Sequence, residues 1–188
     1  MRLSRKMRNV TLFIAMSLDG YIADKDGGVG WLFGQNVQEE TEDVYSDFIK
    51  DVDTVIMGWN TYHQVTTELS PEEWAYKGLK SYIITHRELP PESDRIFTEK
   101  NPCDLVRELL QHPGRDIWIC GGAGIIQPLV EADLIDKYYI SVIPVILGSG
   151  LRLFGGDGKE IPLRLVRTKS YNGITDLVYI RSQEGMEK

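Results

Sequence analysis

The sequence predicts an α/β fold in which helices cover both faces of a mostly parallel central sheet that ends in an antiparallel hairpin. Three observations lead to this prediction. Short apolar runs alternate with amphipathic, helix-like segments, which is the pattern of parallel sheets. The runs are nearly continuous rather than alternating, which indicates strands buried on both sides. The last two runs flank Asn172-Gly173, a strong signal for a tight hairpin turn.

The first elements are a strand and a short extended piece. Val10–Ser17 is an almost unbroken apolar run and is expected to be a central strand. Tyr21–Ala23 is expected to be extended between two turns, because Leu18–Gly20 and Asp24–Gly30 are rich in Asp and Gly.

The next segment predicts a helix followed by two strands. Val37–Lys50 has apolar residues on one side and acidic residues on the other, as expected of a surface helix. Asp53–Met57 and Ser81–Thr85 are the next buried strands. Between them, Asn60 or Thr61 can cap a short helix.

A well-delimited helix and a fourth strand follow. Asn101 is a good N-cap, Pro102 suits the first helical position, and Pro113 stops the helix. Ile117–Cys120 is then a strand that runs into two glycines.

The last part of the chain predicts one more helix and three strands. Ala123–Leu134 is helical by pattern, although Pro128 should kink the helix or delay its start. Lys137–Pro144 is a fifth strand, and Leu163–Tyr171 and Ile174–Arg181 form the closing hairpin.

Size, charge and composition limit the possible functions. A chain of 188 residues with 42% hydrophobic residues is expected to form one domain over residues 1–188, with its core at about residues 8–182. The net charge of -7 argues against a nucleic-acid partner. Met1–Arg8 and the apolar run after it form neither a membrane span nor a cleaved leader, so we expect a cytoplasmic protein without membrane contact. Cys103, Cys120 and the three histidines show no metal-ligand spacing, so neither a metal nor a disulfide is expected.

Two strand ends have the composition of ligand-binding turns. Cys120–Gly124 (CGGAG) allows close approach of a ligand to the backbone, and the helix after it offers free N–H groups to a phosphate. Met57–Thr61 (MGWNT) repeats the arrangement and adds amide and hydroxyl groups. Each alone is as readily an ordinary tight turn. A standard Rossmann fingerprint is excluded, because Gln127 stands where its third glycine would be.

Taken in order, six segments resemble those of dihydrofolate reductases and of the reductase domain of riboflavin biosynthesis (RibD C-terminal type). The last segment is similar to the riboflavin type in particular. The resemblance implies a three-layer dihydrofolate-reductase-like fold and the use of NADPH. The segments are Ile14–Ala23, Val29–Trp31, Val55–Tyr62, Tyr82–Arg87, Ile119–Ile126 and Asp133–Phe154.

The resemblance also implies a set of cofactor-binding residues. Gly121-Gly122 would form a cis peptide against the nicotinamide, with the mouth of the pocket lined by Asp19 and its neighbours. Beside the nicotinamide it implies Ala15, Gly20 and Ile22; at the pyrophosphate Ala123, Gly124 and Ile125; at the other phosphates Gly58, Trp59, Asn60 and Thr61; and at the adenosine 2′-phosphate Thr85, His86 and Arg87.

The substrate half departs from both families. Dihydrofolate reductases hold the pterin with a carboxylate on the first helix, but Val44 stands at that position and Asp47 is on a neighbouring face. Riboflavin-type reductases have a lysine and a glutamate where this chain has Tyr21 and Cys120. Val44, Asp47 and Trp31 are the candidate substrate contacts, although Trp31 could equally be a core residue.

These observations lead to one main hypothesis and two alternatives. The main hypothesis is an NADPH-dependent reductase acting on a small heterocyclic or sugar-derived substrate, like 5-amino-6-(5-phosphoribosylamino)uracil reductase. The proton would come from Asp19, Tyr21 or an ordered water, although Asp19 is as readily a turn residue. The alternatives are a pterin or folate reductase and a non-catalytic nucleotide-binding module. Pro144–Gly156 combines apolar residues with glycines and is expected to contribute to a homodimer.

Overall fold

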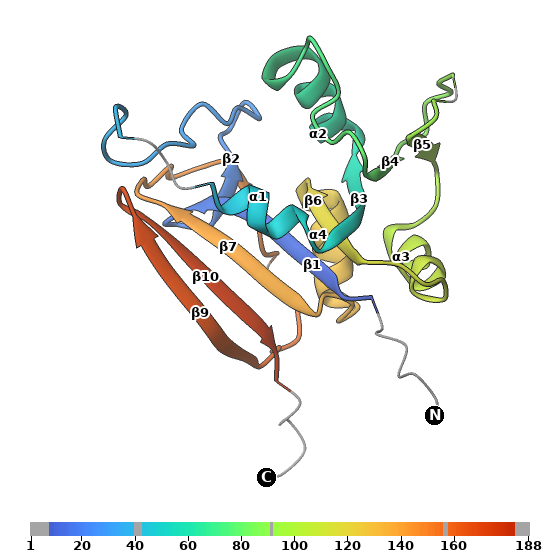
Figure 1. The fold of residues 1–188 in the computed structure, drawn as a ribbon. Helices are drawn as coiled ribbons and strands as arrows, with labels where there is room; N and C mark the ends of the chain where they lie inside the picture. Colours follow the sequence, from blue (N-terminus) through green and yellow to red (C-terminus); the bar gives the residue numbers. More distant parts are fainter. Residues whose placement is uncertain (1–7, 40–42, 91, 156–157, 183–188) are drawn as a thin grey trace.

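The computed structural model describes residues 8–39, 43–90, 92–155 and 158–182, shown in Figure 1. They form ten strands, four α-helices and one π-helical segment. In chain order these are β1 (Val10–Ser17), β2 (Tyr21–Ala23), α1 (Val44–Ile49), β3 (Val52–Gly58), α2 (Trp59–Gln64), η1 (Val65–Leu69), β4 (Lys80–Ile84), β5 (Arg95–Thr98), α3 (Pro102–Leu110), β6 (Asp116–Gly121), α4 (Ala123–Glu131), β7 (Lys137–Ile143), β8 (Leu151–Arg152), β9 (Leu163–Tyr171) and β10 (Ile174–Arg181).

The central sheet has eight strands in the order β5-β4-β3-β6-β1-β7-β10-β9. The pairings from β5 to β7 are parallel, and β10 and β9 add the predicted antiparallel edge. β2 and β8 pair in a small separate sheet. The predicted α/β class, with its mostly parallel sheet and closing hairpin, is therefore confirmed.

Helices cover both faces of this sheet, as predicted. On one face, apolar residues of α3 and α4 pack with Leu12, Ile56 and Ile119 in the larger core cluster. On the other face, Tyr45 and Phe48 of α1 pack around Phe13 and Trp118 in a group of aromatic rings. In Figure 1, α1 crosses in front of the sheet and α4 lies behind it. Burial of these apolar side chains is the main favourable contribution to folding.

The predicted helix at Val37–Lys50 is wrong at residues 37–39 and at Asp43, which are not helical. The α-helix begins at Val44, where Asp43 is the N-cap and accepts a bond from the Ser46 N–H. Residues 40–42 lie outside the described residues. The chain before them is held by the β9–β10 turn, since Asn36 N donates to Asn172 Oδ1 and Asn172 Nδ2 donates to Asn36 O. These side-chain bonds offer the backbone an alternative to helix.

Other boundaries also differ from expectation. α2 is capped by Gly58 rather than by Asn60 or Thr61. α4 starts at Ala123 without delay although it contains Pro128, and it ends at Glu131 before Asp133 turns to a φ of 52°. β5 and β8 were not predicted, because four and two residues are too few for a periodic signal. Within the described parts of the chain, no helix is long and apolar enough to cross a membrane.

Candidate functional site

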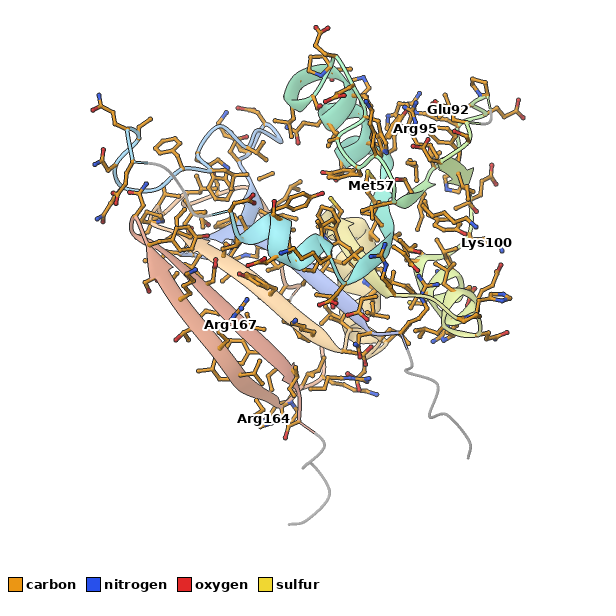
Figure 2. All side chains as sticks on the ribbon, viewed as in Figure 1. Met57, Glu92, Arg95, Lys100, Arg164 and Arg167 are labelled. Carbon is orange, nitrogen blue, oxygen red and sulfur yellow. The ribbon has the colours of Figure 1, made fainter. Side chains whose placement is uncertain are left out.

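The carboxyl ends of β3, β4 and β6 bring the glycine-rich turns together at one edge of the sheet. β3 ends at Gly58 and continues into α2, and β6 ends at Gly121, whose neighbour across the ladder is Met57. In Figure 2, Met57 is labelled at the end of β3 below α2. In parallel sheets this edge is where ligands bind.

The Gly121-Gly122 turn lies directly beside Thr61 of α2. The peptide between these glycines is cis, as the resemblance implied. A Cβ on Gly121 would lie 3.7 Å from Thr61 Oγ1 and 3.8 Å from Ile14 Cδ1, and one on Gly122 would lie 3.6 Å from Thr61 Oγ1. Side chains at these positions would therefore occupy the space beside the Thr61 hydroxyl.

The amino end of α4 faces the same edge. Its N-cap is Gly122, and no side chain among the described residues caps it. Ala123 is partly exposed and Gly124 exposed, so the first turn is open to solvent, whereas Ile125 is buried. A Cβ on Gly58 would lie 3.3 Å from Ile125 Cγ1, so the two turns approach closely. The open positive end of a nine-residue helix can accept an anion.

A cationic platform lies beyond the ends of β3 and β4. The Arg87 guanidinium carbon lies 4.6 Å from the centre of the Trp59 ring, and the Thr85 hydroxyl accepts a bond from Arg87 N at 3.1 Å. Thr85 itself is buried, and Asn60 is exposed at the second residue of α2. The His86 side chain is exposed, with Nδ1 3.8 Å from a Glu99 carboxylate oxygen. Arg87 is thus the stronger candidate to meet a phosphate.

Asp19 joins the end of β1 to the loop after β7. Its carboxylate accepts bonds from Ser17 Oγ at 2.6 Å, Gly148 N at 2.7 Å and Leu147 N at 3.1 Å. The Ser17 bond is the main reason that the pKa of Asp19 falls to about 2. Burial opposes this shift, and the two backbone bonds add to it. This carboxylate is ionised at neutral pH, so the geometry argues for a loop anchor and against a proton donor. Gly20 follows it with a φ of 87°.

Tyr21 and Ile22 of β2 both pack against other side chains of the protein. Tyr21 is buried, and the Arg152 guanidinium carbon of β8 lies 4.8 Å from the centre of its ring. Ile22 packs partly buried against the larger core cluster. Both residues fix the strand that follows the Asp19 turn, and the structure gives Tyr21 a packing partner rather than a position at the Gly121 turn.

Trp31 covers the sheet beside Ala15. Trp31 is 9% exposed, donates its indole N–H to Gly28 O at 3.1 Å, and forms a small core with Ile143 and Ile174. Ala15 packs against this core from β1. The two expectations for Trp31 are therefore compatible, because it is a core residue that also covers the face on which Ala15 lies.

Val44 and Asp47 do not lie with the other candidates. They border a groove of about 170 Å³ beside Thr11, Asp116 and Lys137, which belong to the amino ends of β1, β6 and β7. The exposed Asp47 carboxylate binds Lys50 at 2.6 Å. The substrate contacts of Val44 and Asp47 stay a prediction, and it is Tyr45 and Phe48 of α1 that pack toward the sheet.

The structure adds a pair of residues that the sequence did not identify. The Tyr76 hydroxyl lies 3.7 Å from Cys120 Sγ, directly before the Gly121 turn. Burial raises the pKa of the Cys120 thiol to about 11, against the lowering effect of the Tyr76 bond, and burial also raises the pKa of Tyr76. Cys120 could be identified by its place before Gly121, but Tyr76 lies in an irregular segment without a pattern. Among the described residues, no group of histidine, cysteine and acidic side chains could hold a metal.

Comparison with known proteins agrees with this architecture. The family model of the RibD C-terminal domain matches residues 8–179. The Bacillus subtilis (strain 168) protein YwjB, itself uncharacterized, is 38% identical over 176 residues, which are 93% of this chain and 99% of YwjB. A solved structure from Shewanella sp. PV-4, named for riboflavin biosynthesis, has a TM-score of 0.80 and 27% identity, covering 93% of this chain and 99% of that one. Enterococcus faecalis dihydrofolate reductase, solved with NADP(H), has a TM-score of 0.63 at 12% identity, covering 93% of this chain and 97% of that one, and so shares the fold.

Proposed function

Because the chain belongs to the RibD C-terminal domain family, we propose that it is an NADPH-dependent reductase. Its substrate is a small heterocyclic or sugar-derived molecule resembling 5-amino-6-(5-phosphoribosylamino)uracil. The observation that carries the proposal is the Gly121-Gly122 turn at the carboxyl edge of the sheet, where a Cβ on either glycine would contact Thr61 Oγ1. The glycine backbone at this turn permits close approach of a flat nicotinamide ring.

The surrounding residues fit the rest of the cofactor. The open amino end of α4, at Ala123 and Gly124, would hold the pyrophosphate. Arg87 over Trp59 would hold the phosphate that distinguishes NADPH from NADH. When bound, NADPH supplies the hydride. The fold of an NADP(H)-bound dihydrofolate reductase supports this assignment.

The remaining groups of the chain position the substrate and keep water out. Trp31 closes the face beside Ala15, and the Asp19 carboxylate fixes the loop at Leu147 and Gly148 over the end of β1. Cys120, with a pKa of about 11, and Tyr76, with a raised pKa, both keep their protons at neutral pH. Since such groups release a proton reluctantly, we assign them to orienting the substrate and assign proton delivery to water.

The protein is further proposed to act as a homodimer through residues Pro144–Gly156, of which Gly156 lies outside the described residues. Three large apolar side chains of this segment are exposed, namely Ile146 at 70%, Leu151 at 51% and Phe154 at 42%. Burying such side chains against a second copy removes apolar surface from water. Sedimentation analysis of the wild-type protein and of an Ile146→Asp variant tests this, and a monomeric wild type would refute it.

Two measurements test the proposed function. NADPH and NADH are titrated against the protein by fluorescence, and NADPH oxidation is then followed with 5-amino-6-(5-phosphoribosylamino)uracil and with dihydrofolate. We expect NADPH binding, and oxidation with the pyrimidine exceeding that with dihydrofolate. NADPH binding without turnover of either compound would instead favour a non-catalytic nucleotide-binding module. Absence of NADPH binding would refute the proposal.

A further inference from the structure

A buried carboxylate with three hydroxyl partners lies on β10, away from the glycine-rich turns. Asp176 is fully buried. It accepts bonds from Ser141 Oγ at 2.6 Å, Tyr139 O–H at 3.0 Å and Tyr171 O–H at 3.3 Å. Each of these hydroxyls therefore directs its proton at an Asp176 oxygen.

The sheet register places this cluster beside the proposed nicotinamide pocket. Ala15 of β1 is the ladder neighbour of Ser141 on β7, which is in turn the neighbour of Asp176 on β10. Neighbouring strands lie about 4.8 Å apart, and ladder neighbours point to the same face. Tyr171 packs with Trp31 and Ala15 on that face. The cluster therefore forms a wall of hydroxyl groups on the face of the sheet that Trp31 and Ala15 share.

The members of the wall differ in exposure. Asp176 and Tyr139 are buried, whereas Ser141 and Tyr171 are partly exposed. Arg167 of β9, labelled in Figure 2, has its guanidinium carbon 5.4 Å from the centre of the Tyr139 ring. Burial and then the Asp176 charge raise the pKa of Tyr139 to about 12 and also raise the pKa of Tyr171. Both phenols thus keep the protons that they donate to Asp176 at neutral pH.

We propose that Asp176 is a positioning residue that fixes Ser141 Oγ and the Tyr171 oxygen as hydrogen-bond acceptors for ring N–H groups of the substrate. Because the protons of both hydroxyls are directed at Asp176, only their lone pairs remain for a ligand. The wall therefore selects a pyrimidine that carries N–H donors and disfavours one whose ring nitrogens are blocked. This inference rests on the proposed function, because it takes the space beside Ala15 as the substrate pocket.

Two small pyrimidines test this selection directly. The probes are 5,6-diaminouracil and 5,6-diamino-1,3-dimethyluracil, in which methyl groups replace both ring N–H donors. Their dissociation constants are measured by calorimetry with and without saturating NADP⁺. We expect the wild type to bind diaminouracil about tenfold or more tightly, since each net hydrogen bond contributes roughly 0.5–1.5 kcal/mol and 1.4 kcal/mol is tenfold in affinity.

Variants that remove one oxygen atom show whether these hydroxyls bind the ligand or only pack in the fold. Ser141→Ala and Tyr171→Phe should each reduce the ratio of the two dissociation constants about threefold to tenfold, and Asp176→Asn should reduce it as well. Tyr179→Phe is the matched control, because that phenol packs against the core cluster on the opposite face of the sheet. The control should leave the ratio unchanged, and all variants should keep the NADPH affinity of the wild type.

The outcomes distinguish this inference from the proposed function. Equal or undetectable binding of the two probes by the wild type, or an unchanged ratio in both Ser141→Ala and Tyr171→Phe, overturns the inference. If Asp176→Asn does not fold, these two variants still decide it, because they leave the buried carboxylate in place. Failure of NADPH to bind while the probes show the expected ratios would refute the reductase proposal alone.

Discussion

The guanidinium carbon of Arg87 lies 4.6 Å from the centre of the Trp59 ring, so the end of β4 and the start of α2 share one cationic platform. A charge held over an aromatic face keeps its N–H groups free at the ring edge for a phosphate.

We predict that Arg87→Ala lowers NADPH affinity about tenfold to hundredfold while NADH affinity stays unchanged, because a charge-assisted hydrogen bond contributes roughly 1.5–3 kcal/mol. Fluorescence titration with both cofactors measures this. Arg107→Ala is the control, since Arg107 forms an exposed ion pair with Asp104 on α3. A wild type that binds both cofactors equally would contradict the assignment.

Gly122→Val should fold but lose NADPH binding. The φ of -86° at Gly122 suits any residue, and the one atom within 4 Å of its added Cβ is Thr61 Oγ1. The branched side chain would then fill the space proposed for the nicotinamide.

Gly121→Ala offers a contrast, because its φ of 140° strains a side chain and should lower the free energy of unfolding by about 1–3 kcal/mol. Circular dichroism and NADPH titration measure both. Normal NADPH affinity in folded Gly122→Val would exclude this placement.

Dihydrofolate should be a poor substrate. The carboxylate of Asp47, which could have replaced the missing pterin partner at Val44, binds Lys50 and borders the groove at the amino ends of the strands. Loss of two charge-assisted hydrogen bonds lowers turnover by about two powers of ten or more relative to a dedicated enzyme. Steady-state NADPH oxidation should show this, with Asp47→Asn equal to wild type. Efficient dihydrofolate reduction that disappears in Asp47→Asn would reverse the conclusion.

The Asp19 anchor should weaken in acid. Its pKa is lowered from 3.8 to about 2, so the folded state binds fewer protons than the unfolded state between these values. The stability that Asp19 contributes is therefore complete above about pH 4 and is lost as the pH falls through about 2. Urea unfolding of the wild type and of Asp19→Asn should show a difference in stability that shrinks as the pH falls from about 5 to about 2, a range that spans the two pKa values. A stability difference between the two proteins that stays constant with pH would show that the ionised Asp19 carboxylate does not hold the loop.

The Cys120 thiol should react slowly with iodoacetamide. A pKa of about 11 instead of 9.0 lowers the thiolate fraction about a hundredfold at neutral pH. Because the Tyr76 bond lowers this pKa, Tyr76→Phe should slow alkylation further. Mass spectrometry separates Cys120 from Cys103, and Cys120→Ser is the control. Fast alkylation of Cys120 near pH 7 would contradict the raised pKa of this thiol.

The sequence by itself determined the order and type of most elements. Val10–Ser17, Leu163–Tyr171 and Ile174–Arg181 begin and end where predicted, because long apolar runs and an Asn-Gly turn specify local structure strongly. The cis Gly121-Gly122 peptide followed from the family resemblance alone, and the strand-end rule indicated which edge of the sheet carries the site.

Only the tertiary structure decided which side chains meet. The bonds between Asn36 and Asn172 cross more than half of the chain, and no local pattern signals that they hold the segment before α1 against the hairpin turn. The α1 helix begins only at Val44, and sheet register makes Ser141 the ladder neighbour of both Ala15 and Asp176. Periodicity specifies which face a residue takes within its own element, whereas contacts between distant elements depend on how those elements pack.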